Sequence, residues 1–240
     1  MDWRERIYKT YHDYYIIPVR GRLTRKQIKK QFYAWNYYYG RFLPQNKEAV
    51  ILDAGCGAGE IIYWLRELGF KNAIGVESDL KRIKVAENLG INGILSGDFR
   101  EFLKDKENSY DRIIARDVIE HFDKNNVLGV LDIFHHALKE NGILIIQTPN
   151  AESPFGGRHR YYDFTHSLSF TKTSLNHVLK TVGFKDVKFY PARPVVHGIK
   201  SLIRFALWKL IETAIGIYLL IETGSQKGIF TQNMIVLAKK

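Results

Sequence analysis

Short apolar runs alternate with amphipathic stretches from residue 49 onward. The runs cover 49–55, 72–78, 93–98, 110–117 and 142–149, and two further strand-like patterns lie at 183–192 and 231–240. Apolar residues at helical spacing predict helices at 58–69, 79–89, 124–140 and 171–182, the third ending at an Asn141-Gly142 cap. Strands separated by helices predict an α/β fold with a parallel, doubly wound sheet.

Two segments lie outside this alternation. Residues 1–45 are rich in aromatic side chains and look helical, which predicts a helical N-terminal cap. Residues 194–228 lie between the last two strands and predict a helical insertion. We therefore expect one domain over 1–240, made of the cap, a cofactor-binding core at 46–193, the insertion and a last strand at 229–240.

Composition and charge narrow the class of protein. A chain of 240 residues with 45% apolar content can bury one sizeable core. The single cysteine, Cys56, excludes a disulfide framework and a cysteine-based zinc site, and the first fifteen residues lack a signal-peptide pattern, so we expect a cytoplasmic protein. The net charge of +11 comes from the flanks: Lys+Arg against Asp+Glu is 11 to 4 in residues 1–50, 9 to 3 in 185–240 and 16 to 18 between them. Such flanks are suited to an anionic partner.

The stretch ILDAGCGAG, residues 51–59, is the most specific feature of the chain. A buried strand ends at Asp53, and Gly55, Gly57 and Gly59 make a tight turn into a helix, where the backbone can approach a ligand closely. The spacing G-x-G-x-G differs from the dinucleotide pattern G-x-G-x-x-G. The Asp53 carboxylate would repel a pyrophosphate and suits a cationic ligand, such as the sulfonium of S-adenosylmethionine.

Two more acids end the next two strands. Glu77 is placed to bind both ribose hydroxyls, and Asp98 is placed to accept from an adenine amino group while Phe99 covers the ring. Three acids at successive strand ends, together with the glycine turn, favour a cofactor site. The alternative is that each acid only caps a helix or is a solvent-exposed charge in a loop. The expected cofactor contacts also include Cys56 in the turn, Ser78 beside Glu77, and Arg116 near the end of the fourth strand.

On these residues the chain resembles the class I S-adenosylmethionine-dependent methyltransferases. The resemblance covers about 49–192 and includes DAGCGAG, Glu77, the GDF at 97–99 and the strand RIIARDVIEHF. It implies a Rossmann-like seven-stranded sheet of order 3-2-1-4-5-7-6, with strand 7 antiparallel. More narrowly, TPN…RYYDFTHSLSFTKTSL is similar to methyltransferases encoded with bacterial surface-polysaccharide and O-antigen assembly genes.

The motifs that are absent favour an oxygen acceptor. Methyltransferases that act on exocyclic amines of bases usually carry an Asn/Asp-Pro-Pro-Tyr/Phe turn after the fourth strand, where this chain reads ARDVIEHF. Methylation of cytosine carbon 5 needs a cysteine nucleophile, and Cys56 lies inside the cofactor turn. Methyl transfer to a hydroxyl requires alignment of the oxygen and removal of its proton, so a base is expected.

The candidate base lies in RHRYYDFTH, residues 158–166, on the edge where the cofactor is expected. His166 is the first choice, with Asp163 to orient its imidazole, and His121 competes as base or holds a backbone carbonyl under the cofactor. Arg158, Arg160 and Tyr161 could bind an anionic or hydroxyl-rich acceptor. The alternative is that His166 only caps the loop and that Asp163 pairs with Arg160.

No metal is expected. Asp117, Glu120 and His121 hint at a divalent cation, but they lack a second acidic pair, and we expect activity without one.

The insertion suggests a membrane partner. Residues 202–221 have the length of a span but carry Arg204, Lys209 and Glu212, so an interfacial helix over 199–222 is expected instead. The alternative is that it packs on the enzyme's own sheet or on a second subunit.

The main hypothesis is a peripheral O-methyltransferase of a sugar or lipid-linked glycan hydroxyl, on the inner face of the cytoplasmic membrane. Three alternatives are a methyltransferase of a small phenol or quinone precursor, an RNA-directed methyltransferase using the basic aromatic flanks, and a cofactor-binding protein without catalysis. A nucleic-acid partner is not expected.

Overall fold

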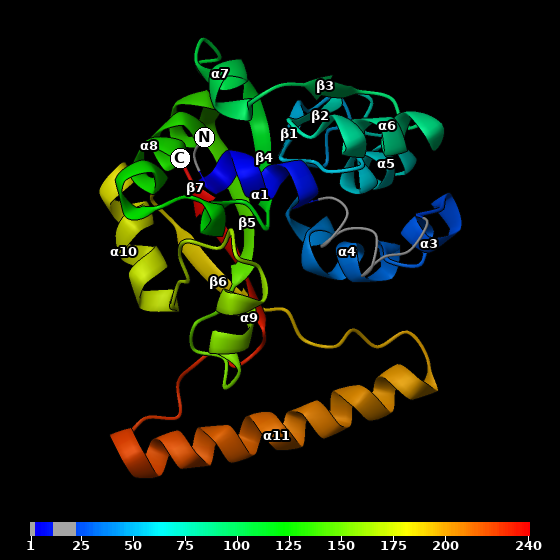
Figure 1. The fold of residues 1–240 in the computed structure, drawn as a ribbon. Helices are drawn as coiled ribbons and strands as arrows, with labels where there is room; N and C mark the ends of the chain where they lie inside the picture. The colour runs from blue at the N-terminus through cyan, green and yellow to red at the C-terminus, as the bar shows by residue number, and fades with distance from the viewer. Residues whose placement is uncertain (1–2, 12–22) are drawn as a thin grey trace.

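The computed structural model describes residues 3–11 and 23–240 and contains one seven-stranded sheet (Figure 1). The strands are β1 (Ile51–Ala54), β2 (Ala73–Glu77), β3 (Ile94–Ser96), β4 (Tyr110–Arg116), β5 (Leu138–Pro149), β6 (Val187–Pro191) and β7 (Asn233–Lys239). Their order is β3-β2-β1-β4-β5-β7-β6, and β7 is antiparallel to both neighbours. The predicted fold class and strand order are confirmed.

Helices cover both faces of the sheet, and each face has its own hydrophobic cluster. One face carries α7 (Phe99–Leu103), α8 (Lys124–Ala137) and α10 (Lys172–Val182). The other carries α5 (Glu60–Glu67), α6 (Leu80–Asn88), α3 (Arg25–Lys29) and α4 (Phe32–Tyr38), the last followed by a 3-10 turn, η2 (Gly40–Phe42). Burial on both faces explains why the central strands are nearly continuous apolar runs.

The third predicted helix ends earlier than expected. Leu138 leaves α8 in an extended conformation and pairs with Tyr110, so β5 begins directly after the helix. Asn141 adopts a left-handed conformation (φ 64°) inside β5, where the register against β4 shifts. The Asn-Gly pair therefore belongs to an irregularity in the strand and does not cap the helix.

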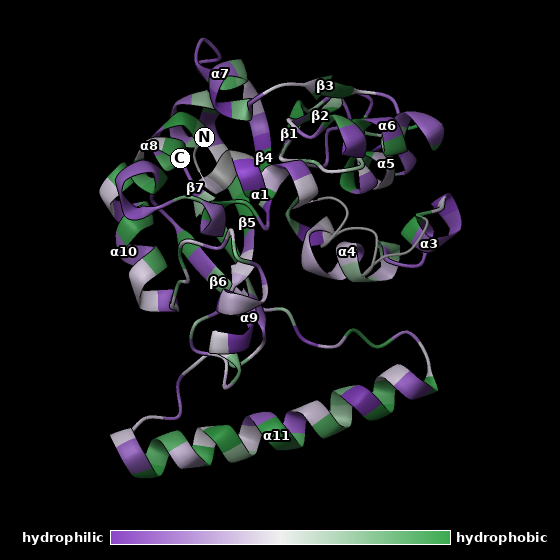
Figure 2. Ribbon diagram, in the orientation of Figure 1, coloured by the Kyte–Doolittle hydropathy of each residue, from purple (hydrophilic) through white to green (hydrophobic). Residues whose placement is uncertain are grey.

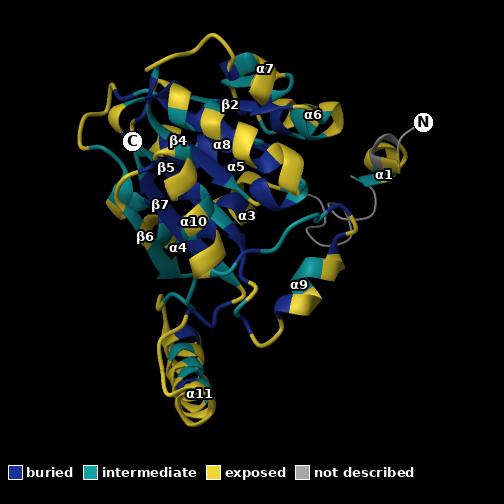
Figure 3. Ribbon diagram, turned by 90° about the vertical axis from the view of Figure 1, so that its left-hand side faces the viewer, coloured by how far each residue is buried: buried dark blue, intermediate teal, exposed yellow. Residues whose placement is uncertain are grey.

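The N-terminal region is helical where it is described, and it has two roles. Ile28, Trp35 and Tyr39 join the core cluster on the α5 side of the sheet. By contrast, α1 (Trp3–Tyr11) lies on the same side of the molecule as α9 (Gly156–Tyr162) (Figure 3), and it contacts the segment that follows α9 through Trp3–Phe164 and Tyr11–Asp163. Part of the predicted cap, residues 12–22, lies outside the described residues.

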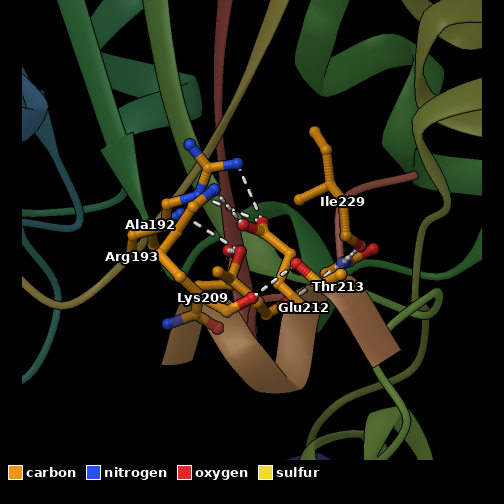
Figure 4. Close-up of polar contacts among 9 residues, drawn as sticks. Ala192, Arg193, Lys209, Glu212, Thr213 and Ile229 are labelled. Atoms are coloured by element: carbon orange, nitrogen blue, oxygen red, sulfur yellow. Dashed lines mark hydrogen bonds and ion pairs between the residues drawn. The ribbon is translucent and has the colours of Figure 1, made fainter. Parts of the chain in front are cut away.

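The predicted insertion forms one long helix, α11 (Ile199–Thr223), which is set apart from the sheet (Figures 1 and 3). Among the described residues, none of α11 belongs to either core cluster. The Arg193 guanidinium lies 2.8 Å from the Glu212 carboxylate, which also accepts from Lys209 at 2.8 Å (Figure 4). The helix is thus held through the connection that precedes it.

Candidate active site

A cavity of about 620 Å³ opens at the carboxyl ends of β1, β2 and β4. The glycine turn, the end of β2 and the start of α7 line one part of it, and α1, η3 (Ile119–His121) and α9 line the other. Of the predicted cofactor residues, the cavity is lined by Gly55, Gly57, Glu77, Ser78, Asp98, Phe99 and Arg116. Of the predicted catalytic residues, it is lined by His121, Asp163 and His166.

Glu77 ties the glycine turn to the end of β2. One carboxylate oxygen accepts from the Gly57 N–H at 2.7 Å, and the other accepts from the N–H groups of Ser78 and Asp79, both at 2.8 Å. The Arg82 guanidinium lies 3.6 Å away. The carboxylate is therefore held at the cavity wall, and ribose hydroxyls would share it with these donors.

Asp98 has a structural partner that the sequence does not reveal. Its carboxylate caps α7 through the Arg100 N–H at 2.8 Å and forms an ion pair with the Arg100 side chain. Burial raises the pKa of Asp98, but its hydrogen bonds and ion pair with Arg100 outweigh burial and hold the pKa below its usual value. Phe99 stacks on Phe134, with ring centroids 5.3 Å apart, and it also lines the cavity.

Three predicted cofactor residues lie behind the cavity wall. Asp53, Cys56 and Gly59 are not among the lining residues. The Cys56 side chain packs against Gly75, where an added Cβ would come within 2.5 Å of the sulfur, so only the backbone of Cys56 contributes to the turn. Burial raises the pKa of Asp53 to about 7, although Arg116 opposes the shift.

Asp163 orients His121, not His166. The Asp163 carboxylate accepts from the Tyr11 hydroxyl at 2.5 Å and from the Thr165 hydroxyl at 2.7 Å. Thr165 Oγ1 lies 2.8 Å from His121 Nδ1. Because the hydroxyl gives its one hydrogen to the carboxylate, His121 Nδ1 must donate, which leaves Nε2 as an acceptor. Burial, helped by the neighbouring His166, lowers the pKa of His121 to about 4, so this ring is neutral near pH 7.

His166 is oriented by a backbone carbonyl. Its Nδ1 lies 3.0 Å from the His159 carbonyl oxygen, which can only accept, so Nδ1 donates and Nε2 is the acceptor in the neutral ring. The two imidazole rings meet edge to face, with centroids 4.9 Å apart. The structure therefore pairs the two histidines that the sequence presents as rivals.

Glu120 lies beside this pair and is fully buried. Its Oε2 accepts from the Thr148 hydroxyl at 3.1 Å, whereas Oε1 has no hydrogen-bond partner among the described residues. Burial, with a further contribution from Asp117, raises the pKa of Glu120 well above its usual value. One potential ligand atom from each of Glu120, His121 and His166 lies within 4.8 Å of the others, a proximity that the sequence does not show.

A second hollow of about 360 Å³ adjoins the cavity, because Asp163 and His166 line both. Trp3, Phe164, Tyr161 and Arg160 also line it. Arg160 donates to the Ser167 carbonyl at 2.8 Å, so the alternative of an Arg160–Asp163 pair is wrong. Arg158 is exposed and lines neither hollow.

Several functional candidates escape sequence reasoning. Tyr11, Thr165 and Arg82 reach the site or its hydrogen bonds only through tertiary contacts. The segment after β5 contains a helix that was not predicted from the sequence, α9, which carries His159 to the cavity. The sequence named Glu120 together with Asp117 and His121, but its proximity to His166 is a tertiary contact that the sequence does not show.

Comparisons with known proteins agree with this geometry. The family model described as "Methyltransferase domain" matches residues 28–188. A ubiquinone biosynthesis O-methyltransferase of Methylocella silvestris is 28% identical over 138 residues, which are 55% of this chain and 53% of that protein. The chain thus matches only about half the length of this relative.

Solved structures share the fold. A SAM-dependent methyltransferase from Archaeoglobus fulgidus superposes with a TM-score of 0.67 at 23% identity, over 95% of this chain and all of that one. Phosphoethanolamine N-methyltransferase 2 of Haemonchus contortus, in complex with S-adenosyl-L-methionine, gives 0.60 at 16% identity, over 93% of this chain and 59% of that one.

The family match, the sheet order and the glycine turn beneath the cavity lead to one conclusion. The chain belongs to the methyltransferase domain family and is a class I S-adenosylmethionine-dependent methyltransferase.

Proposed function

We propose that this enzyme methylates a hydroxyl group on the sugar of a lipid-linked glycan at a membrane surface. The observation that carries the proposal is the continuity of three features. The cofactor cavity meets a paired-histidine site, and the same histidine site opens into a hollow walled by aromatic rings and an arginine.

The reaction is an in-line displacement at the sulfonium methyl. The hydroxyl oxygen forms a bond to carbon while the sulfur–carbon bond breaks and the oxygen loses its proton. Nε2 of His166 and Nε2 of His121 are both acceptors beside the cavity, so the pair is suited to remove that proton. His166 also lines the second hollow, which makes it our first choice as base.

The second hollow suits a sugar. Trp3, Tyr161 and Phe164 offer ring faces and edges against which the apolar side of a pyranose can stack, and Arg160 offers a charged rim. Tyr161 is 80% exposed and Phe164 66% exposed, so both rings are accessible from solvent.

The outer side of α11 suits a membrane surface. Its exposed apolar side chains fall on one half of the helix at about 100° per residue: Leu202, Ile203, Leu207, Leu210, Ile211, Ile217, Tyr218, Leu220 and Ile221. The opposite half contains the buried Ser201 and Gly216 and the ion-paired Glu212. Figure 2 shows apolar residues along the whole helix.

Charge favours an anionic bilayer as the occupant of this face. Lys200 and Arg204 lie at one edge of the apolar half and Lys209 lies at the other, as in helices that rest in the headgroup layer. None of the described helices is sufficiently long and apolar to cross a membrane. A surface-bound α11 would bring the catalytic domain to acceptors anchored in the inner leaflet of the cytoplasmic membrane.

A small phenol or quinone precursor is the second candidate. It is favoured by the name of the Methylocella silvestris relative, an O-methyltransferase of ubiquinone biosynthesis. The same cavity and histidine pair would serve that reaction.

Product analysis tests the acceptor class. Incubation of the enzyme with methyl-labelled cofactor and a bacterial membrane extract should label a glycolipid, and acid hydrolysis should release a labelled O-methyl sugar. Label that appears only in a phenolic or quinone fraction would replace the main proposal by the second candidate. Label in RNA would contradict both.

Cofactor affinity should depend on Glu77 and Asp98. Glu77→Ala should weaken binding by the loss of one or two hydrogen bonds to a charged group, about 1.5–3 kcal/mol each. Asp98→Ala should also weaken binding, because it releases Arg100 and α7 beside the adenine site. Calorimetry measures both, with Asp132→Ala on the outside of α8 as control. Wild-type affinity in both variants would show that neither Glu77 nor Asp98 contributes to cofactor binding.

The histidine pair should control the transfer step. His166→Ala should lower the single-turnover rate by roughly 10²–10⁴-fold while cofactor affinity stays within a few-fold. His121→Ala tests the rival assignment, and His177→Ala, on the exposed side of α10, is the matched control. Near wild-type rates for both His121→Ala and His166→Ala would show that the loop only grips the acceptor.

Membrane binding should depend on the outer side of α11. The protein should sediment with vesicles that contain anionic lipid, and less at high salt, because screening weakens the basic edges. Leu210→Asp with Ile217→Asp should abolish this binding. Asn88→Asp with Asn125→Asp adds the same charge elsewhere and should retain most of it. Equal sedimentation of the two double variants would contradict a membrane role for α11.

A further inference from the structure

One carboxylate and two imidazoles lie close together in the wall of the cavity, and one of the imidazoles, His166, also lines the second hollow. Glu120 and His121 come from η3, and His166 comes from the segment after α9. One oxygen or nitrogen atom from each lies within 4.8 Å of the other two. The sequence shows Glu120 and His121 as neighbours but does not reveal the third member.

Both imidazoles are already oriented as ligands. His121 Nδ1 donates to Thr165, which donates to Asp163, and His166 Nδ1 donates to the His159 carbonyl. Metal-binding histidines are commonly held in this way, with one ring nitrogen donating to a protein oxygen so that the other keeps its lone pair for the metal. No described residue hydrogen-bonds to either Nε2 atom.

Glu120 supplies an independent observation. It is completely buried, lines the cavity, and its Oε1 has no partner within the described part of the chain. A buried oxygen that accepts no hydrogen bond lowers the stability of the fold unless a ligand binds to it. Thr148 holds the other oxygen at 3.1 Å, which fixes the position of the carboxylate.

The spacing is close to that of a coordination sphere. Three ligand atoms that each lie about 2.1 Å from one cation are at most about 3.6 Å from one another, compared with the limit of 4.8 Å found here. Side-chain movements of about an ångström would close the set. Two imidazole nitrogens and one carboxylate oxygen favour Mn²⁺, Co²⁺, Fe²⁺ or Zn²⁺ over Mg²⁺ or Ca²⁺, which prefer oxygen ligands.

We propose that Glu120, His121 and His166 bind one divalent transition-metal cation, with the open coordination position toward the acceptor hydroxyl. This deepens the proposed function and rests on it for the role of the cation, but the site itself does not depend on it. A hydroxyl bound to the cation loses its proton to water more readily. The oxygen then takes the methyl group from the sulfonium, which leaves as a neutral thioether. In this arrangement His121 and His166 act as ligands, and water takes the proton that the metal-free mechanism above assigns to His166.

Cation binding tests the site without an acceptor. The full chain is stripped with a chelator, dialysed, and titrated separately with Mn²⁺, Co²⁺ and Zn²⁺ by calorimetry, and Co²⁺ is also followed by its visible absorption. We expect one cation per chain. Glu120→Gln, His121→Asn and His166→Asn should each weaken binding at least a hundredfold, and Thr165→Val should weaken it about 10–100-fold through His121.

The control variants are His177→Asn and Glu222→Gln, which change the same residue types on exposed helix surfaces. They should bind like the wild type. Cofactor affinity in every variant reports whether the fold is intact. No binding of any of the three cations by the wild type overturns the site, as does equal affinity in the wild type and His166→Asn.

Activity tests the role separately. Methyl transfer by the stripped protein should fall at least tenfold and return with stoichiometric Mn²⁺, Co²⁺ or Zn²⁺. Full transfer by metal-free protein overturns the role of the cation and leaves a histidine as the base. Failure of the proposed function looks different, because the cation would bind while no glycan hydroxyl is methylated.

Discussion

The buried carboxylate of Asp163 joins three segments that are far apart in the chain. It accepts from Tyr11 on α1 and from Thr165 in the loop after α9, and through Thr165 it orients His121 on η3. Burial and this hydrogen bond raise the pKa of Tyr11 above its usual value, so the phenol remains a donor. A carboxylate buried at this depth is stable only when such donors surround it. The wall of the site, the position of α1 and the tautomer of His121 therefore depend on one another.

The cofactor side depends on a second carboxylate with a similar role. Glu77 binds N–H groups from the glycine turn after β1 and from the start of the segment after β2. Parallel neighbouring strands end at the same edge of the sheet, which allows one side chain to bridge both turns. The backbone of the turn is thus positioned before any ligand arrives, and cofactor binding needs little reordering.

Helix α11 differs from the other long helices in the direction that its exposed apolar side faces. The other long helices bury their apolar stripe against the sheet, whereas the apolar half of α11 faces away from it. The ion pair of Glu212 with Arg193, in the connection before the helix, holds the opposite half toward the body. Apolar surface of this extent on one helix marks an interaction site, and its orientation follows from the polar anchors on the other side.

Local pattern alone was sufficient to predict most of the fold. The alternation of runs and amphipathic stretches indicated every strand and most of the long helices, because periodicity reflects which side of an element is buried. Boundaries were less certain. The Asn141-Gly142 pair is typical of a helix cap, but the strand already begins at Leu138, which pairs with Tyr110. Asn141 therefore adopts its left-handed conformation inside the strand.

The sequence by itself determined the glycine turn and the acids at the strand ends, because these depend on residues that are adjacent in the chain. It also identified His121, Asp163 and His166 as candidates. Only the tertiary structure decided which of these groups lie together: Asp163 orients His121 through Thr165, and Glu120 lies beside the two histidines. Such contacts depend on how loops from different strand ends fold over one another, and no local periodicity records that.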